Sequence, residues 1–401
     1  MKNFGTIYRY ELKKLLNRKF TWIMVLVLAA FMAYIARPVS NSGGAQFSLT
    51  DRDGNTVSEY ISVAEQRKLI DKGEQRINRQ VMDEQFFQNV REASTGNGQY
   101  IIQENLDLDS YFYLVDSSYY EPYTMIAHQA GLDPAETSAE DFYRSRQETI
   151  ERQYGGRTGG EIAYWQDMEA QVEKPFVYRY ISGYQDILAD VFGLSNVIPL
   201  VAAVCLCGVF SEEKRTRADA LIFSSKQGRF PQYLAKVLAG VTVILAAMLL
   251  VIGADAVTIL LTQGWDGFDA ALQLENLNSS LPISIGQATL TMLGLLLLYG
   301  LLCGGVTMLF SAVTQNTVAA LSAPVLLMIC QAWLRLDVQA AEYLPNQLFN
   351  TIPSLRNMNL VNVFGCYLNN LQFGLILYVG LALTLLALCW LGWRRSATGS
   401  P

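Results

Sequence analysis

Charged residues are scarce in this sequence, and two long stretches have none. Asp, Glu, Lys and Arg make up 16% of the 401 residues, whereas a soluble domain usually carries about 25%. None of them occurs between Asn276 and Leu334 or between Asn357 and Trp393. Because a helix with one side in water needs polar residues every turn or two, these stretches exclude an ordinary soluble protein. They indicate an integral membrane protein.

The side chains that many hydrolases and metal enzymes use are also missing. His128 is the only histidine, which excludes Ser–His catalytic triads and His-rich metal sites. No Gly-x-x-x-x-Gly-Lys-Ser/Thr motif occurs, so the chain has no P-loop with which to bind ATP. We therefore expect no catalytic residue, no cofactor and no metal. If ATP drives this protein, a partner chain must hydrolyse it.

The segment from Arg37 to Asp190 differs from the rest of the chain in charge, and it has no cysteine. It contains 14 basic and 26 acidic residues, a net charge of −12, while the remainder has 16 basic and 10 acidic residues, a net charge of +6. A disulfide-stapled exterior domain is excluded, which suits a bacterial surface. No Lys/Arg cluster is dense enough for phosphate contacts, so we expect no binding of nucleic acid.

Six apolar runs have about the length that a helix needs to cross a bilayer core, roughly 20 residues. They are Phe20–Ala36, Val191–Phe210, Val237–Thr262, Ile283–Phe310, Val318–Leu334 and Phe373–Trp393. The predicted fold class is an all-α polytopic membrane protein. It has six transmembrane helices and a mainly helical extracellular domain inserted between the first two.

Lys and Arg gather on one side of the predicted membrane. They are frequent in the first 19 residues, after the second run and at the end of the chain, and absent from residues 265–282. The positive-inside rule then makes both termini cytoplasmic and predicts a multi-pass protein of a cell membrane. The predicted segments are an interface helix at 1–19, a transmembrane helix at 20–36, an extracellular domain at 37–190, transmembrane helices two to six at 191–393 with a cytoplasmic loop at 211–232, and a tail at 394–401.

Two helices are predicted within the extracellular domain. Apolar residues recur at mixed spacings of three, four and seven from Ile61 to Arg91 and indicate a long helix. Ser138, with Asp141 three residues later, resembles a capping box, and Gly155 is a natural end for the helix that it opens. The glycine-rich segment from Gly155 to Gly160 lacks the Lys-Ser/Thr of a phosphate loop and is interpreted as a flexible connector.

Two cytoplasmic segments are amphipathic. Residues 4–16 combine an apolar stripe with basic residues and predict a short helix along the membrane surface. In the loop at 211–232, Ser211 can cap a helix whose positive end is stabilised by Glu212 and Glu213. Lys214 and Arg215 follow, and an apolar patch comes after them. A helix with charges first and an apolar patch second suits a groove in a soluble partner.

Leu221 and Ile222 are the residues of that patch predicted to contact the partner. The one clear charge inside a predicted span is Asp255, in the third run. A carboxylate inside a membrane is a functional candidate by default, so Asp255 is a candidate for the transport path.

The membrane part of the chain resembles the permease subunits of ABC-2-type ABC transporters. Three motifs carry the resemblance: Tyr10-Glu11-Leu12-Lys13-Lys14, the loop from Phe210-Ser-Glu-Glu-Lys-Arg215 to Ser224-Ser225, and the turn Phe310-Ser-Ala-Val-Thr-Gln-Asn-Thr317. The segment Lys174-Pro175-Phe176 to Gly183 is similar to the subset with a large exterior insert. Many polysaccharide exporters of this family lack that insert.

The resemblance implies a six-helix export permease. Two permeases, two copies or a copy and a paralogue, would pair and be driven by separate ABC ATP-binding subunits between inward- and outward-facing states. The loop at 211–232 would be the coupling helix on the ATPase, and residues 342–372 would match the family's re-entrant helices. A membrane anchor or sensor that displays the extracellular domain without transport is the alternative. Peptide antibiotics, lipids, sodium and drugs all stay open as substrates.

Overall fold

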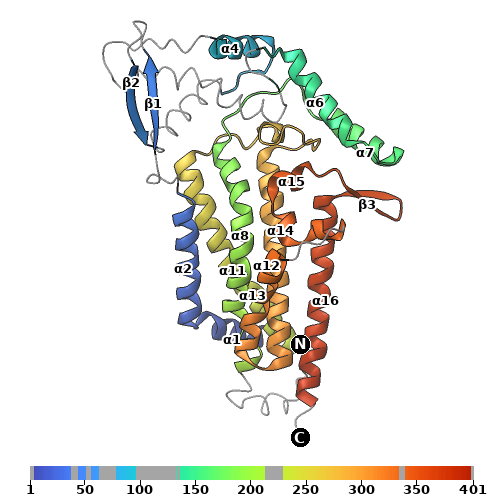
Figure 1. Ribbon diagram of the computed structural model, residues 1–401. Coiled ribbons are helices and arrows are strands. Elements are labelled where there is room, and N and C mark those ends of the chain that lie inside the picture. The colour runs from blue at the N-terminus through green and yellow to red at the C-terminus, as the bar shows by residue number, and fades with distance from the viewer. Residues whose placement is uncertain are drawn as a thin grey trace.

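The long apolar helices run side by side as a bundle, with both chain ends toward one end and the acidic segment at the other (Figure 1). The structure is a computed structural model that describes residues 4–37, 44–50, 56–62, 78–95, 132, 136–212, 229–333 and 339–398. The bundle helices are α2 (Lys19–Ile35), α8 (Ser182–Leu206), α11 (Arg229–Gln263), α12 (Ile285–Thr314), α13 (Thr317–Trp333) and α16 (Asn370–Thr398). The short helix α1 (Phe4–Leu16) precedes α2.

All six apolar runs are largely helical, but they differ in length and hydropathy. Within the described residues, α8, α11, α12 and α16 are each long and apolar enough to cross a membrane. The pair α1 and α2, bent by 63°, meets the same criteria only when both are taken together. The apolar part of α13, Thr317–Cys330, is shorter. The structure therefore supports a membrane protein with four or five spans by this measure, and the count of six stays a prediction.

Small residues bring α12, at the centre of the bundle, close to its neighbours. It packs against α8, α11, α13 and α16. A Cβ added at Gly300 would lie 1.9 Å from Met248 Sδ, and one at Gly304 would lie 2.9 Å from Ile244 Cδ1. Close approach of this kind allows dense packing between helices that lipid cannot drive together by the hydrophobic effect.

The acidic segment is helical only in part. Its described elements are the antiparallel hairpin of β1 (Gly44–Thr50) and β2 (Thr56–Ser62), followed by α4 (Glu84–Thr95), α6 (Ala139–Gln153) and α7 (Gly159–Ala170). The capping box predicted at the start of α6 is confirmed. The backbone N–H of Asp141 donates to Ser138 Oγ at 3.1 Å, and the Asp141 carboxylate accepts from the backbone N–H of Ser138.

The prediction of one helix from Ile61 to Arg91 is wrong at its start and correct at its end, since α4 covers Glu84–Thr95. Ile61 lies in β2, paired with Ala45, and Val81 forms an isolated β-bridge with Val177. The helix begins only after Asp83, whose Oδ1 accepts from the backbone N–H groups of the first helical turn at 3.1 and 3.2 Å. Local strand pairing and this cap override the apolar spacing. Residues 63–77 lie outside the described residues.

The interpretation of Gly155–Gly160 as a flexible connector is also wrong in part. Gly159 and Gly160 are the first two residues of α7. Thr158 forms a second capping box with Glu161, in which Thr158 Oγ1 accepts from the backbone N–H of Glu161 at 3.4 Å. The sequence signal, Thr-x-x-Glu, was present but was obscured by the surrounding glycines.

A buried arginine fixes the helices of the acidic segment onto the bundle. Arg146, in α6, is 1% exposed. Its guanidinium pairs with Glu169 of α7 and donates to the carbonyl oxygens of Leu277 and Ser279 at 2.8 and 3.0 Å. Those carbonyls belong to the segment between α11 and α12. Burial alone would raise the pKa of Glu169, but the contacts with Arg146 and Lys174 leave it below its ordinary value.

The segment between α13 and α16 turns back beside the bundle. It contains the 3-10 helix η3 (Gln339–Tyr343), α14 (Pro345–Leu348), α15 (Thr351–Arg356) and a hairpin of β3 (Leu360–Val363) and β4 (Cys366–Asn369). The helix α14 packs against α8 and α13, and Figure 1 shows α15 nearer the acidic segment. Phe349 is fully buried, and Thr351 Oγ1 donates to Leu188 O of α8 at 3.0 Å. The hairpin was not predicted.

Candidate coupling platform and a buried carboxylate

The predicted partner-binding loop is described only at its two ends. Glu213, Lys214, Arg215, Leu221 and Ile222 lie outside the described residues. Its first end continues from α8 through Ser211 and Glu212, and its second end begins α11 at Arg229. The structure can therefore show how the loop is anchored, while its predicted contact residues remain a proposal.

Glu212 ties the first end of the loop to the joint between α1 and α2. Its carboxylate accepts a very short hydrogen bond from Arg18 and lies 4.0 Å from Lys14 Nζ. Arg18 Nη2 also donates to Gly208 O at 3.1 Å. Since Arg18 sits at the bend between α1 and α2, one guanidinium connects the loop to both helices. Ion pairs that water still reaches contribute up to about 1 kcal/mol, so this half-buried contact positions the loop more than it stabilises the fold.

A buried serine connects the same end of the loop to the turn between α12 and α13. Ser311 Oγ accepts from the backbone N–H groups of Phe210 and Ser211, both at 3.2 Å, and donates to Cys207 O at 2.9 Å. The hydroxyls of Ser211 and Thr317 lie 2.9 Å apart. A turn that the sequence analysis noted only as a family motif therefore holds the root of the loop.

An aromatic cluster joins the two ends of the loop to α16. The rings of Phe210 and Tyr233 stack with centroids 6.1 Å apart, and Trp393 lies 6.2 Å from Phe210 and 6.0 Å from Tyr233. Phe230 meets Trp390 edge to face at 5.3 Å. Aromatic pairs of this kind contribute about 0.5–1.5 kcal/mol beyond their buried area. The first turn of α11 and the last turns of α16 thus form one block with the loop's root.

The helix α1 is also attached to α11 by a buried ion pair. Lys236 Nζ lies 3.1 Å from Glu11 Oε1, and the two side chains are 0% and 7% exposed. Tyr8 Oη and Thr242 Oγ1 lie 3.0 Å apart on the same interface. The sequence predicts the helix at 4–16 correctly, but part of the face assigned to the membrane surface packs on α11 instead. Glu11 belonged to a recognised motif, although its partner, 225 residues away, left no local signal.

Asp255, in α11, is a charged residue buried within the bundle. It is 0% exposed, and neither carboxylate oxygen has a hydrogen-bond partner among the described residues. The Asp190 carboxylate of α8 acts on it by electrostatic repulsion. One turn before Asp190 along α8, Asp186 Oδ2 accepts from Gln263 Nε2 of α11 at 2.9 Å. The candidate from the sequence therefore lies in a group of acids that the sequence did not predict.

A further buried acid lies in the segment between α11 and α12. Glu275 is 8% exposed, and burial together with the charge of Asp186 raises its pKa to about 7. The segment also holds the 3-10 helix η2 (Leu272–Leu274). At neutral pH this carboxyl is therefore only partly ionised.

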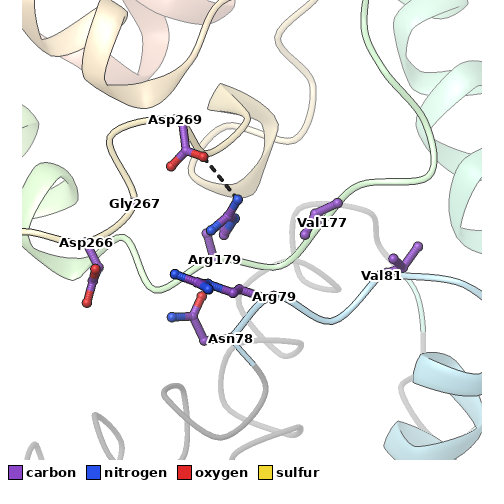
Figure 2. A pocket seen from close by; sticks show the side chains of 8 residues that line it. All are labelled: Asn78, Arg79, Val81, Val177, Arg179, Asp266, Gly267 and Asp269. Atoms are coloured by element: carbon purple, nitrogen blue, oxygen red, sulfur yellow. Dashed lines mark hydrogen bonds and ion pairs between the residues drawn. The ribbon is translucent and has the colours of Figure 1, made fainter.

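A solvent-facing pocket of about 570 Å³ opens where the acidic segment meets this same segment (Figure 2). It is lined by Asn78, Arg79, Val81, Val177, Arg179, Asp266, Gly267 and Asp269. Arg179 Nη2 donates to Asp269 Oδ2 at 3.0 Å, and Arg79 has the uncommon φ of 70°. Two arginines, two aspartates and an asparagine line the pocket beside two valines, so its chemistry favours water and small polar groups.

No group of three or more His, Cys, Asp or Glu side chains that could hold a metal ion occurs in the described part of the chain. A comparison with protein-family models matches residues 19–394 to the family described as ABC-2 family transporter protein. No match is found among curated proteins or among solved structures.

Proposed function

The chain belongs to the ABC-2 transporter family, and we propose that it is the export permease of an ATP-driven pump whose ATPase docks on the loop at 211–232. Family membership makes the chain a membrane component of an ABC transporter, a component that usually works with an ATP-binding subunit and is not itself catalytic. The proposal adds the direction of transport, the docking site and the mechanism of coupling.

The anchoring of the loop at both ends supports this proposal. A displacement of the loop would be transmitted by three contacts. Glu212 connects it to α1 and α2, Ser211 to the α12–α13 turn, and Phe210 to α11 and α16. Rigid-body movements between inward- and outward-facing states need such stiff connections, because packed helices transmit displacement while loose loops absorb it. The partner's ATP hydrolysis would then move most of the bundle together.

For the membrane arrangement, we propose six spans with both termini cytoplasmic and the acidic segment outside the cell. The location of both chain ends at the basic end of the bundle supports this orientation (Figure 1). The described part of α13 has 17 residues, at the lower end of the range of about 17–25 that a spanning helix needs.

We propose in addition that two permeases pair, as copies or as a copy and a paralogue. Large apolar side chains are exposed along α2 and α16, among them Phe20, Phe31, Leu383 and Leu391. These faces would be covered by lipid or by the second permease. The exposed apolar area fits a protein in a bilayer, where neighbouring helices and lipid tails provide the same apolar contact.

A double substitution in the loop tests the docking site. Leu221→Asp with Ile222→Asp should abolish co-purification of the ATP-binding subunit from native membranes, because two apolar anchors would be replaced by charges. The loss should amount to roughly 2 kcal/mol or more of binding free energy. Nucleotide-binding chains in the eluate can be identified by mass spectrometry and by ATPase activity.

Phe364→Asp provides the matched control. Phe364 is a fully exposed apolar residue in the β3–β4 turn, at the opposite end of the bundle, and its replacement should leave the ATPase bound. If no nucleotide-binding chain co-purifies with the wild-type protein, the result supports the anchor or sensor function instead. If the loop variant retains the ATPase as well as the Phe364 variant does, the docking site is elsewhere.

A further inference from the structure

The facing surfaces of α8 and α11 place acidic residues in a column that leads into the bundle. Gln263, near the end of α11, donates to Asp186, near the start of α8, so the helices are antiparallel and in contact there. Asp190 follows Asp186 by one turn, and Asp255 precedes Gln263 by two turns. Residues four apart share one face of a helix. Both acids therefore continue the contact inward, consistent with the electrostatic repulsion between them.

The burial of Asp255 is not compensated by any hydrogen bond within the described part of the chain. An ionised carboxylate without a partner costs several kcal/mol or more in an apolar interior, so such a group is neutralised by a proton or by a cation. Ala256 follows Asp255 directly and Ile259 lies one turn further along α11, where both pack in an apolar cluster with Ile187 of α8. A fully buried carboxyl with two unpartnered oxygens is a rare feature in a folded protein and needs an explanation.

No basic group of the described elements faces this carboxyl. The helix α12 has no charged residue, and the only charge in α2 is Lys19 at its far end. Arg37, just after α2, is exposed. On α11 itself, Lys236 is 19 residues away, about 28 Å along the helix, and is paired with Glu11. The charged groups on this side are therefore acids: Asp190, Asp186 and, beyond them, Glu275.

We propose that Asp255 and Asp190 form a binding site for the protonated amine of the transported substrate. The substrate class would be an organic cation with an apolar body. This inference rests on the proposed export function, whose substrate it narrows.

An ammonium group has three N–H donors, which two carboxylates can accept, and the neighbouring isoleucines would contact its apolar substituent. Mg²⁺ and Ca²⁺ require six or more oxygen ligands, so two carboxyls among apolar side chains do not suit them. Before an amine binds, the like charges of Asp190 and Asp255 oppose ionisation of both acids together, so the pair retains a proton. Entry of R–NH₃⁺ forms the ion pair Asp255–COO⁻···⁺H₃N–R and releases one H⁺ to water.

The test uses the full-length protein in lipid nanodiscs near neutral pH, with a dansyl-labelled pentylamine as the probe. Its neutral control is the dansyl-labelled pentanol of the same chain length. We expect the amine to bind roughly tenfold more tightly than the alcohol, a modest fraction of the attraction available between close charges. Asp255→Asn and Asp190→Asn should each remove this preference and leave alcohol binding unchanged. Asp266→Asn, which alters an exposed acid of the outer pocket, should retain it.

Proton release provides a second readout. A pH-indicator dye should record protons released as the wild-type protein binds the amine and none released by Asp255→Asn. Equal binding of amine and alcohol by the wild-type protein, or an Asp255→Asn variant that binds the amine normally, would overturn the proposal. If Asp255→Asn fails to fold, the proposal is tested by the Asp190→Asn variant and by the comparison of amine and alcohol binding to the wild-type protein.

These outcomes are separable from failure of the proposed function. Amine binding requires no ATPase, so the Leu221→Asp, Ile222→Asp variant should still prefer the amine. Conversely, Asp255→Asn should still co-purify with the ATP-binding subunit. Loss of the amine preference with retained ATPase would concern the substrate site alone.

Discussion

Buried acidic residues at the two ends of the bundle differ in whether they are paired with a basic residue. At the end that holds both chain termini, Glu11 is paired with Lys236 and Glu212 with Arg18, so that α1, α2, α8 and α11 are joined. At the other end, Asp255 lies buried without a hydrogen-bond partner, and Asp190 adds a like charge. Paired charges fix one arrangement of helices, whereas an uncompensated carboxyl responds to whatever proton or cation arrives. The end with the chain termini is therefore suited to transmitting movement between helices, and the end with Asp255 is suited to binding a ligand.

The largest expected effect comes from breaking the pair at the first end. Lys236→Met leaves Glu11 buried and uncompensated, which should cost about 3–5 kcal/mol of folding free energy. The double variant Glu11→Leu, Lys236→Met should recover most of this loss, because apolar side chains can replace a buried pair. Denaturation of the purified protein, followed by tryptophan fluorescence, measures both.

Lys14→Met is the matched control for that experiment. Lys14 lies 4.0 Å from Glu212 and is partly exposed, so its loss should cost no more than about 1 kcal/mol. If Lys236→Met were as stable as Lys14→Met, the ion pair would not be what holds α1 to α11.

The acidic end also contains a buried cation that is paired, Arg146, and its removal sharpens the comparison. Arg146→Met should cost about 3 kcal/mol, because Glu169 and the carbonyls of Leu277 and Ser279 lose their buried donor. Protease should then cut residues between α6 and α7 faster in the folded protein. Arg144→Met, which changes an arginine that is 58% exposed in the same helix, should leave both stability and cleavage nearly unchanged.

The smallest expected effect is a pH dependence from Glu275. The pKa of its carboxyl is raised from 4.5 to about 7 in the folded protein. The protonated form is thus favoured by folding: its contribution is complete below the unfolded pKa and is lost as pH rises through 7. From about pH 5 to about pH 8, the wild-type protein should lose on the order of 2 kcal/mol relative to Glu275→Gln.

Thermal unfolding at several pH values measures this difference. Glu140→Gln is the control, because Glu140 is largely exposed and should show no such trend. A stability difference between Glu275→Gln and wild type that stays constant across the range would mean that Glu275 does not titrate there.

Much of the bundle could be predicted because its signals are local. The run from Val237 to Thr262 is apolar at nearly every position, and α11 forms over it regardless of its neighbours. The Ser138–Asp141 capping box is likewise complete within four residues. The strand at Thr56–Ser62 was missed because a strand is stabilised by its partner, here Gly44–Thr50, and its apolar residues also fit a helical spacing.

The residues of the candidate sites also divide into those that a local sequence signal marks and those that it does not. A charge within an apolar run can be read from the sequence, so Asp255 was identified, and an apolar patch behind charges marked Leu221 and Ile222. Their surroundings could not be predicted. Arg18 and Glu212 are 194 residues apart, and Ser311 is about 100 residues from the two N–H groups that it accepts. Neither spacing leaves a periodic or compositional trace.

The sequence by itself determined that this is a membrane protein, that its basic residues gather at one end of the bundle, and that it has no P-loop. Composition and contiguous motifs are sufficient for these three conclusions. Only the tertiary structure decided which charges are paired. Glu11 and Asp255 are both acids in or beside apolar helices, yet Glu11 meets Lys236 and Asp255 has no hydrogen-bond partner among the described residues. The physical reason is that the free energy of a buried charge depends on the atoms within a few ångströms of it. Those atoms belong to residues from distant parts of the chain.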